Sequence, residues 1–304
     1  MTANREHNDG RVDAVQLHNE CKSGRVESFL PLISPYLPHA RLTAYCILRN
    51  REDMEEVVQE AVLKAFVKIN QLREAEKLKA WLLRIVVNEA RMHQRKYRPH
   101  LFESLKQDSE DEEEFKPRQF VDWRNIPLKE LEQKELRVAL TDALNRLEDG
   151  YREVFFLRDV QHLSAQETGK MLDLSEAAVN TRLHRARLQL REMLTPLFRS
   201  EKRRWGPMSL RMAQLMGKRF LRKTISCKKV VSEISNYVDG NMTPELRSEI
   251  EQHVRICDRC SAILDSTRKL IYIAGEERVF VVPFASNQNW EQLLNEARGQ
   301  APQP

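Results

Sequence analysis

The chain has 304 residues, of which 31% are charged and 7% aromatic, with only 9 glycines and a formal net charge of +5. This length leaves room for two or three small domains, and the scarcity of glycine and aromatic residues favours an all-helical, all-α protein. No apolar run approaches the ~20 residues of a membrane helix and no signal peptide opens the chain, so we expect a cytoplasmic protein without a membrane partner.

The charge is distributed unevenly. Residues 175–223 hold thirteen Lys and Arg against three Glu, a net of +10, whereas residues 103–114 hold seven acidic residues against one Lys, a net of −6. Such asymmetry indicates that one part of the chain contacts nucleic acid and that another part is repelled by it.

The N-terminal part predicts a bundle of helices. Apolar residues recur at helical spacing from Val15 to Ile47, with prolines marking the turns, and a strong helix is predicted from Arg51 to Asn70. The outer side of that helix carries Asp53, Glu56, Glu60 and Lys64. Without further information this polar side is a solvated face.

A third helix is predicted from Lys79 to Arg98, and it becomes basic toward its end. The basic residues there are Arg91, His93, Arg95, Lys96 and Arg98. A basic groove with polar and aromatic groups suits an unstacked single strand of nucleic acid. Trp81 fits a core position better than a stacking platform.

Residues 99–127 predict a linker. Proline stands at both ends, and Asp108 to Glu114 form a dense acidic run that resists packing and favours disorder. Two interpretations explain this composition equally well: a plain tether, or a segment that occupies a basic channel.

Two predicted helices, from Leu128 to Leu147 and from Tyr151 to Val160, precede a helix-turn-helix between Ser164 and Leu194. Ser164 can cap its first helix, with Glu167 three residues on, and Ser175 can cap the second. The intervening Leu-Asp-Leu has about the length that a helix-turn-helix allows.

The second helix of this motif has two unlike faces. Its apolar face consists of Val179, Leu183, Ala186, Leu190 and Leu194. The other side and its flanks carry Asn180, Thr181, Arg182, His184, Arg185, Arg187 and Arg191. An Arg-rich front on an apolar back suits the major groove, where Arg can bind guanine through two hydrogen bonds. The alternative is a solvated basic face on a core helix.

A basic stretch from 199 to 223 follows, which we interpret as a linker helix, although an extra DNA contact or a docking helix remains open. Beyond it, His253, Cys257 and Cys260 follow an H-x3-C-x2-C spacing that lets all three face one ion, and Cys227 can complete a tetrahedral site. Three thiolates and an imidazole suit zinc. The alternative is three unrelated thiols and a surface histidine.

Three motifs carry a resemblance to bacterial sigma factors of the extracytoplasmic-function (ECF) type. Residues 163–187 resemble the "LSxxEIAxxLGxSxGTVxSRLxRAR" of sigma region 4, Glu56-Val-Val-Gln-Glu60 resembles the "D-x-x-Q-E" of region 2.2, and residues 81–95 resemble the "WLxRIxxNxxxDxxR" of regions 2.3 and 2.4. The chain departs from these patterns at five positions: Glu56 for Asp, Met92 for Asp, Gly169 for Ala, Asp173 for Gly and Thr181 for Ser. Asp173 predicts a different turn.

The resemblance implies a partner and two DNA elements. It implies that region 2 docks on the β′ clamp helices of core RNA polymerase, and that region 4 meets the β flap. The implied polymerase-binding residues are Asp53, Glu56, Gln59 and Glu60. Those implied for the melted −10 element are Asn88, Arg91, Arg95 and Lys96. Those implied for the −35 element of promoter DNA are Asn180, Thr181, Arg182, His184, Arg185 and Arg187.

Residues 224–272 resemble the zinc-binding anti-sigma domain, a small helical unit that clamps sigma regions 2 and 4. In this resemblance Tyr237-Val-Asp-Gly is an interhelical turn and Thr243 caps the next helix. Family members commonly place a His in or near the first ligand position, where we choose Cys227. The resemblance implies an intramolecular contact between this domain and the sigma regions, and thiolate ligands offer an oxidation or metal-exchange trigger.

These patterns predict six parts: region 2 (1–98), an acidic linker (99–127), region 4 (128–198), a basic linker helix (199–223), a zinc-binding domain (224–272) and a tail of unassigned role (273–304). We expect an ECF-type transcription initiation factor regulated in cis. The alternative is a stand-alone helix-turn-helix regulator with a metal-sensing domain. An enzyme is not expected, because a catalytic zinc needs an open coordination position and a Cys3His site is closed.

Overall fold

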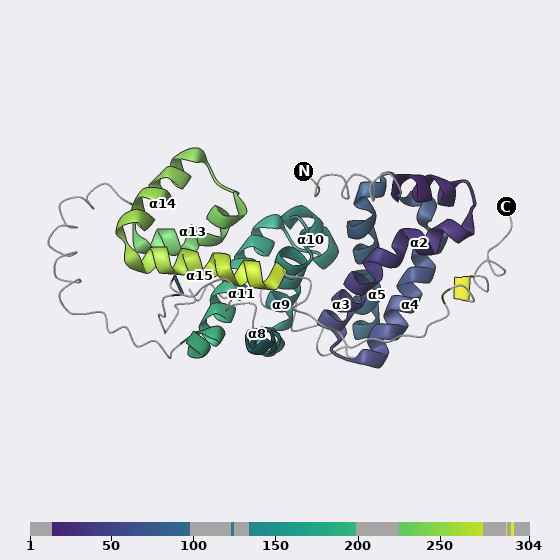
Figure 1. Cartoon of the computed structure of the whole chain (residues 1–304), viewed down its shortest axis with the longest axis horizontal. Coiled ribbons are helices and arrows are strands. Elements are labelled where there is room, and N and C mark those ends of the chain that lie inside the picture. Colours follow the sequence, from purple (N-terminus) through teal and green to yellow (C-terminus); the bar gives the residue numbers. More distant parts are fainter. Residues whose placement is uncertain are drawn as a thin grey trace. The chain divides into compact units, whose positions relative to one another are not determined.

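The computed structural model describes residues 14–97, 123–124, 134–198, 225–275, 290 and 293–294 (Figure 1). Within these ranges every regular element is a helix, which confirms the all-α prediction. None of the helices described there is long and apolar enough to cross a membrane. The predicted linker other than 123–124, the basic stretch 199–223 and almost all of the tail lie outside the described residues.

Contacts divide the chain into two compact units. The first comprises residues 1–110, 166–174 and 281–304, and the second comprises residues 111–165 and 175–280. The second unit therefore holds both the predicted recognition helix and the Cys/His cluster.

The first unit is built on three helices that pack against one another: α3 (Leu37–Leu48), α4 (Arg51–Val67) and α5 (Leu78–Tyr97), with the short α2 (Phe29–Ile33) before them. Their apolar faces are fully buried, as predicted from the spacing, and include Ala44, Met54, Val58, Leu82 and Val86. Burial of such faces is the main favourable term for a bundle.

Local signals set where α4 begins. The side chain of Asn50 accepts hydrogen bonds from the backbone N–H groups of Glu52 and Asp53, at 2.8 and 3.1 Å. This cap satisfies two donors that the first helical turn leaves open. Between α5 and its neighbours, Lys64 pairs with Glu89 and the Gln94 side chain donates to the carbonyl of Ile47 at 2.9 Å.

The second unit contains α8 (Lys134–Arg146), α9 (Asp149–Phe155), which continues as a π-helix over Phe156–Val160, and α11 (Glu176–Leu194) with a 3-10 turn after it (Thr195–Phe198). It also contains α13 (Cys227–Asp239), α14 (Pro244–Ile256) and α15 (Asp258–Gly275). The prediction of one apolar helix from 151 to 160 is thus replaced by a helix that widens halfway.

The helix-turn-helix begins with α10 (Ala165–Leu172) and turns at Asp173. Asp173 has φ +58°, and the N–H of Leu174 donates to the carbonyl of Gly169 at 2.9 Å. Asp tolerates this left-handed conformation better than most residues with a side chain. Asp173 therefore adopts a left-handed backbone conformation of the kind that glycine favours. The prediction of a turn that differs from that of the family stays a prediction.

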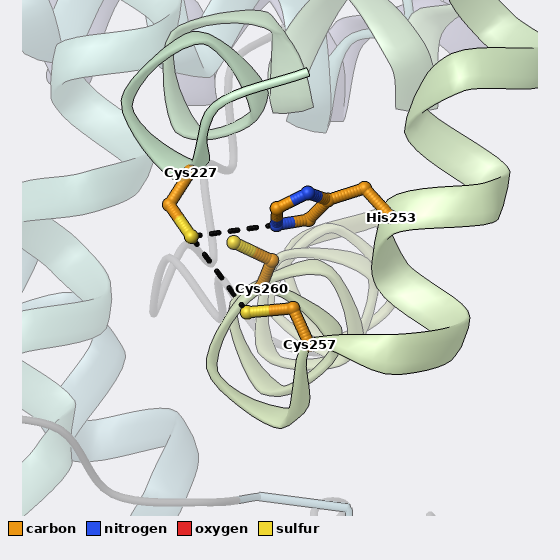
Figure 2. A group of neighbouring side chains, drawn as sticks. All are labelled: Cys227, His253, Cys257 and Cys260. Atoms are coloured by element: carbon orange, nitrogen blue, oxygen red, sulfur yellow. Dashed lines mark hydrogen bonds between the residues drawn. The ribbon is translucent and has the colours of Figure 1, made fainter. Parts of the chain in front are cut away.

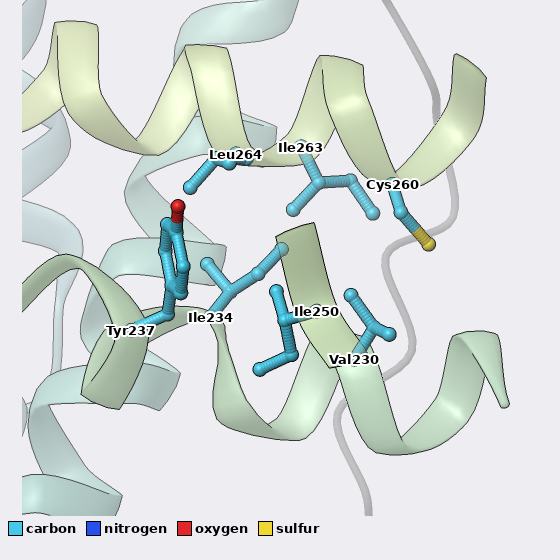
Figure 3. Close-up of a cluster of buried hydrophobic side chains, with 7 residues drawn as sticks. All are labelled: Val230, Ile234, Tyr237, Ile250, Cys260, Ile263 and Leu264. Carbon is cyan, nitrogen blue, oxygen red and sulfur yellow. The ribbon is translucent and has the colours of Figure 1, made fainter. Parts of the chain in front are cut away.

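Helices α13, α14 and α15 share a small core of their own, shown in Figure 3: Val230, Ile234, Tyr237, Ile250, Cys260, Ile263 and Leu264. The Thr243 side chain caps α14 by accepting from the N–H of Leu246 at 3.4 Å, as predicted. Tyr237 to Asp239 belong to the last turn of α13, and Gly240, with φ +76°, ends the helix. The predicted interhelical turn at Tyr237 to Gly240 therefore begins only at Gly240.

The far end of α15 lies close to the segment that follows the π-helix. A Cβ atom added at Gly275 would stand 3.1 Å from Cε1 of His162, which is closer than an ordinary van der Waals contact. Glycine therefore permits this approach.

Candidate metal centre and recognition helix

The four predicted zinc ligands come from three helix ends (Figure 2). Cys227 is the first residue of α13, His253 lies in the last turn of α14, Cys257 follows that helix and Cys260 lies in the first turn of α15. Cys257 is extended, with φ −98° and ψ 100°, which separates α14 from α15 and turns its side chain toward the others. All four ligand atoms lie within 4.8 Å of one another.

The spacing of these atoms fits a tetrahedral ion. Zn–S bonds of about 2.3 Å and Zn–N bonds of about 2.05 Å place two sulfurs about 3.8 Å apart, and a sulfur and a nitrogen about 3.6 Å apart. Cys227 Sγ lies 3.8 Å from Cys257 Sγ and 3.4 Å from Nε2 of His253. The donor set of the cluster suits zinc, and the two distances from Cys227 are close to those of a tetrahedral site.

The pKa values of two thiols in the cluster, Cys257 and Cys260, shift in opposite directions. Hydrogen bonding by Cys260 lowers the pKa of Cys257, while the same partnership and burial raise the pKa of Cys260. A thiolate is the form that ligates a metal, so this arrangement favours a cation among the sulfurs.

The predicted recognition helix is α11, and the Ser175 side chain caps it by accepting from the N–H of Ala178 at 3.1 Å, as expected. The predicted apolar face is buried: Val179, Leu183, Ala186, Leu190 and Leu194. On the predicted DNA face, Thr181 is exposed, while Asn180, Arg182, His184 and Arg185 are half-buried. Arg185 donates to the hydroxyl of Tyr151 at 3.3 Å.

Arg187, the remaining residue predicted to contact DNA, is 3% exposed. Its guanidinium donates to both oxygens of Asp159, at 2.8 and 2.6 Å, and to both oxygens of Asp239, at 3.2 and 2.8 Å. Burial alone would lower the pKa of Arg187, but the two carboxylates more than offset it and raise that pKa. In this conformation Arg187 cannot reach a base.

Asp239 belongs to α13, so Arg187 is a contact between the recognition helix and the C-terminal helices. Arg158 lies 3.6 Å from the same carboxylate. Two further contacts follow α11: Nδ1 of His184 and Oγ of Ser235 are hydrogen-bonded at 3.1 Å, and Nε of Arg191 donates to Oγ of Ser266 at 2.5 Å. The C-terminal helices therefore pack along the polar side of α11.

Sequence reasoning missed these partners. Asp239 was interpreted only as part of a turn, and Asp159, Ser235 and Ser266 were not singled out. The one signal in the sequence is an acidic residue, Asp239, at the end of a predicted helix in a chain that also carries an Arg-rich helix.

The contact with Ser235 predicts a pH dependence. Burial, and then the nearby charge of Arg187, lower the pKa of His184 from 6.5 to about 4. We call the chain docked when α13 and α15 contact α11, as in this structure, and undocked when they do not. Between pH 4 and pH 6.5 the docked chain keeps His184 neutral and so binds fewer protons than the undocked chain. Docking is therefore favoured above pH 6.5 and weakens as the pH falls toward 4. We expect the ring signals of His184 in an NMR titration of the full chain to move near pH 4. A midpoint near 6.5 would contradict the burial.

The residues predicted to bind polymerase and the −10 element occupy two helices of the first unit. On α4, Glu56 and Glu60 are exposed, and Asp53 and Gln59 are half-buried. On α5, Asn88, Arg95 and Lys96 are exposed, and Arg91 is half-buried. Nε2 of His93 lies 3.9 Å from carboxylate oxygens of both Asp53 and Glu56, so an acidic face and a basic helix end adjoin at this point.

Comparison with known proteins adds three family matches. Residues 32–99 match "Sigma-70 region 2", residues 137–190 match "Sigma-70, region 4", and residues 227–261 match "Putative zinc-finger". The ECF RNA polymerase sigma factor SigW of Bacillus subtilis is 28% identical over 186 residues, which is 59% of this chain and 95% of SigW. The ECF RNA polymerase sigma-E factor of Haemophilus influenzae is 28% identical over 180 residues, which is 58% of this chain and 92% of that protein.

Among solved structures, the sigma factor RpoE in complex with the anti-sigma factor NepR from Bartonella quintana is similar to this chain at 24% sequence identity. The similarity covers 56% of this chain and 98% of that chain, with a TM-score of 0.41.

Proposed function

We propose that this chain, an ECF-type RNA polymerase sigma factor with a zinc-finger-like domain at its C-terminal end, binds core RNA polymerase and directs it to specific promoters. The observation that carries the proposal is the presence of both sigma-70 regions, in order, on one chain whose similarity to SigW spans 95% of that protein. A stand-alone helix-turn-helix regulator would not need region 2.

Promoter contacts are assigned to exposed and half-buried polar residues of two helices. On α11 these are Asn180, Thr181, Arg182, His184 and Arg185, for the −35 element. On α5 they are Asn88, Arg91, Arg95 and Lys96, for the −10 element. Arg side chains at the start of a recognition helix can read guanine edges, and a basic helix end can follow a single strand. Arg187, held by two carboxylates, is assigned to positioning α11 in the docked state.

Core polymerase binding is assigned to the acidic face of α4, because Glu56 and Glu60 are exposed and the helix packs through its opposite side. Glu56→Lys with Glu60→Lys is expected to weaken assembly with core polymerase at least tenfold, since like charges opposed across an interface cost several kcal/mol. Co-purification with core polymerase measures this effect.

The matched control for this prediction is Glu245→Lys with Glu249→Lys, which makes the same charge change at exposed residues of α14. Circular dichroism would establish that both variants fold. Equal assembly by the α4 variant and its control would remove α4 from the polymerase interface.

We also propose that Cys227, His253, Cys257 and Cys260 hold one zinc ion. A closed set of three sulfurs and one nitrogen supplies a structural cross-link between helix ends rather than a reactive position. Each ligand lies at an end of α13, α14 or α15, so the ion would fix the mutual arrangement of those three helices.

The contacts along α11 support regulation in cis. His184, Arg187 and Arg191 all bond to residues of α13 or α15, so the C-terminal helices and DNA would compete for the same side of α11. We propose that the zinc domain holds region 4 in a state that reads the −35 element poorly. Because both partners belong to one chain, an effective concentration of about millimolar keeps even a weak contact closed.

Reconstitution with core RNA polymerase tests the proposed function. Run-off transcription from a pool of promoter fragments is expected to depend on the full chain and to select one class of −35 and −10 sequences. A stand-alone regulator would bind DNA without polymerase and would not support initiation by core enzyme, and that result would overturn the proposal.

A further inference from the structure

Two residues of the predicted linker are held against the last long helix. Trp123 is fully buried, with 0% exposure, and its carbonyl accepts a hydrogen bond from Nζ of Lys269 on α15. The next residue, Arg124, forms an ion pair with Asp258 at the start of α15, with a distance of 3.2 Å. Both attachments join the linker to a helix of the zinc domain, 146 residues further along the chain for Trp123.

Lys269 is placed to hold a backbone group rather than to remain in solvent. It is only 9% exposed, and its ammonium group lies 2.9 Å from the carboxylate of Asp265. A buried ammonium is costly unless it is paired and hydrogen-bonded, and here Asp265 supplies the charge partner while the Trp123 carbonyl takes a further N–H. The indole beside it is the largest of the fully buried side chains described.

One helix thus contacts both the recognition helix and the linker. Ser266 of α15 accepts from Arg191 of α11, and Lys269, three residues on, binds the carbonyl of Trp123. Residues three apart lie on neighbouring positions of a helix surface. The contacts of α15 with α11 and with the linker are therefore formed or lost by movement of the same element.

We propose that α15 carries a binding site for the linker between regions 2 and 4, with Trp123 as its anchor, and that the zinc domain restrains the linker together with region 4. The description of this segment as the linker between regions 2 and 4 rests on the proposed function. The contact between Trp123 and α15 does not depend on that function. If Trp123 were simply part of the core of region 4, its protection would not depend on Lys269.

A full chain with Trp123 as its sole tryptophan tests the proposal, using Trp81→Phe, Trp205→Phe and Trp290→Phe. The emission of Trp123 is expected to be blue-shifted and poorly quenched by acrylamide. Lys269→Met with Arg124→Ala removes both attachments without touching the cysteines or His253, and is expected to shift the emission to longer wavelength and to raise the quenching constant several-fold.

The matched control is Arg268→Met with Arg73→Ala, which makes the same charge change at exposed residues and should leave both readings unchanged. If the double variant fails to fold by circular dichroism, Arg124→Ala alone should give a smaller rise in quenching. Protection of Trp123 that is unaffected by these changes, or an exposed Trp123 in the parent chain, would overturn the proposal. The measurement uses neither polymerase nor promoter, so its failure is distinguishable from failure of the proposed function.

Discussion

A chain in which Cys257 and Cys260 are both replaced by alanine is expected to lose its zinc and, with it, the fold of α13 and α14. The apolar core of the zinc domain has seven buried residues, one of them the ligand Cys260, with partly buried hydrophobic residues packed around them, which is little for three helices. Structural zinc contributes about 10–16 kcal/mol in small peptides, as much as the whole stability of a typical domain. A closed site with four ligands holds one zinc ion. Metal analysis should therefore find about one zinc per chain in the parent and almost none in the variant.

The matched control is Cys21→Ala with Cys46→Ala, which removes the same number of thiols from the first unit. Cys21 is a buried thiol whose pKa burial raises to about 11, so it is not disposed to ligate a metal. The control chain should retain its zinc and its helical signal. Unchanged zinc content after loss of Cys257 and Cys260 would mean that these sulfurs are not ligands.

The second large effect is expected at Asp239, the carboxylate that α13 contributes between Arg158 and Arg187. Asp239→Lys adds a third cation to this nearly buried cluster, where the Asp239 side chain is 12% exposed. Loss of one partner from a buried ion pair costs about 3–5 kcal/mol. The zinc domain should therefore separate from α11, and promoter affinity and run-off transcription should rise at least tenfold.

Zinc content and a charge control separate this result from simple unfolding. The Asp239→Lys chain should keep its zinc, because the four ligands are untouched. Glu249→Lys, at an exposed position of α14, makes the same charge change and should leave transcription at the parent level. If the Asp239 variant keeps its zinc and transcribes no better than the parent, the proposed regulation through α11 is wrong.

The local features of the chain could be predicted because they depend on short-range chemistry. Ser175 and Thr243 cap their helices through their own side chains, and the spacing of His253, Cys257 and Cys260 brings three donors together within two helix ends. The apolar row on α11 follows directly from the helical period.

The contacts between distant segments could not be predicted in the same way. A helical period places Arg185 opposite the apolar row of α11 and Arg187 on its flank, but it does not show that Arg187 is buried between the tertiary partners Asp159 and Asp239. The burial of Trp123 could not be predicted either, because this residue lies in a stretch whose composition predicts disorder. A lone tryptophan in such a stretch is the signal that deserved weight.

The close approach of Gly275 to His162 gives α15 a mechanical consequence. This helix has 18 residues, and at 1.5 Å per residue it is a rod of about 27 Å. Cys260, in its first turn, faces the metal cluster, and Gly275, at its other end, lies against the segment that follows the π-helix. A small tilt of α15 at its cysteine end would be amplified along the helix. Binding or loss of an ion at Cys260 would therefore displace Gly275 relative to His162.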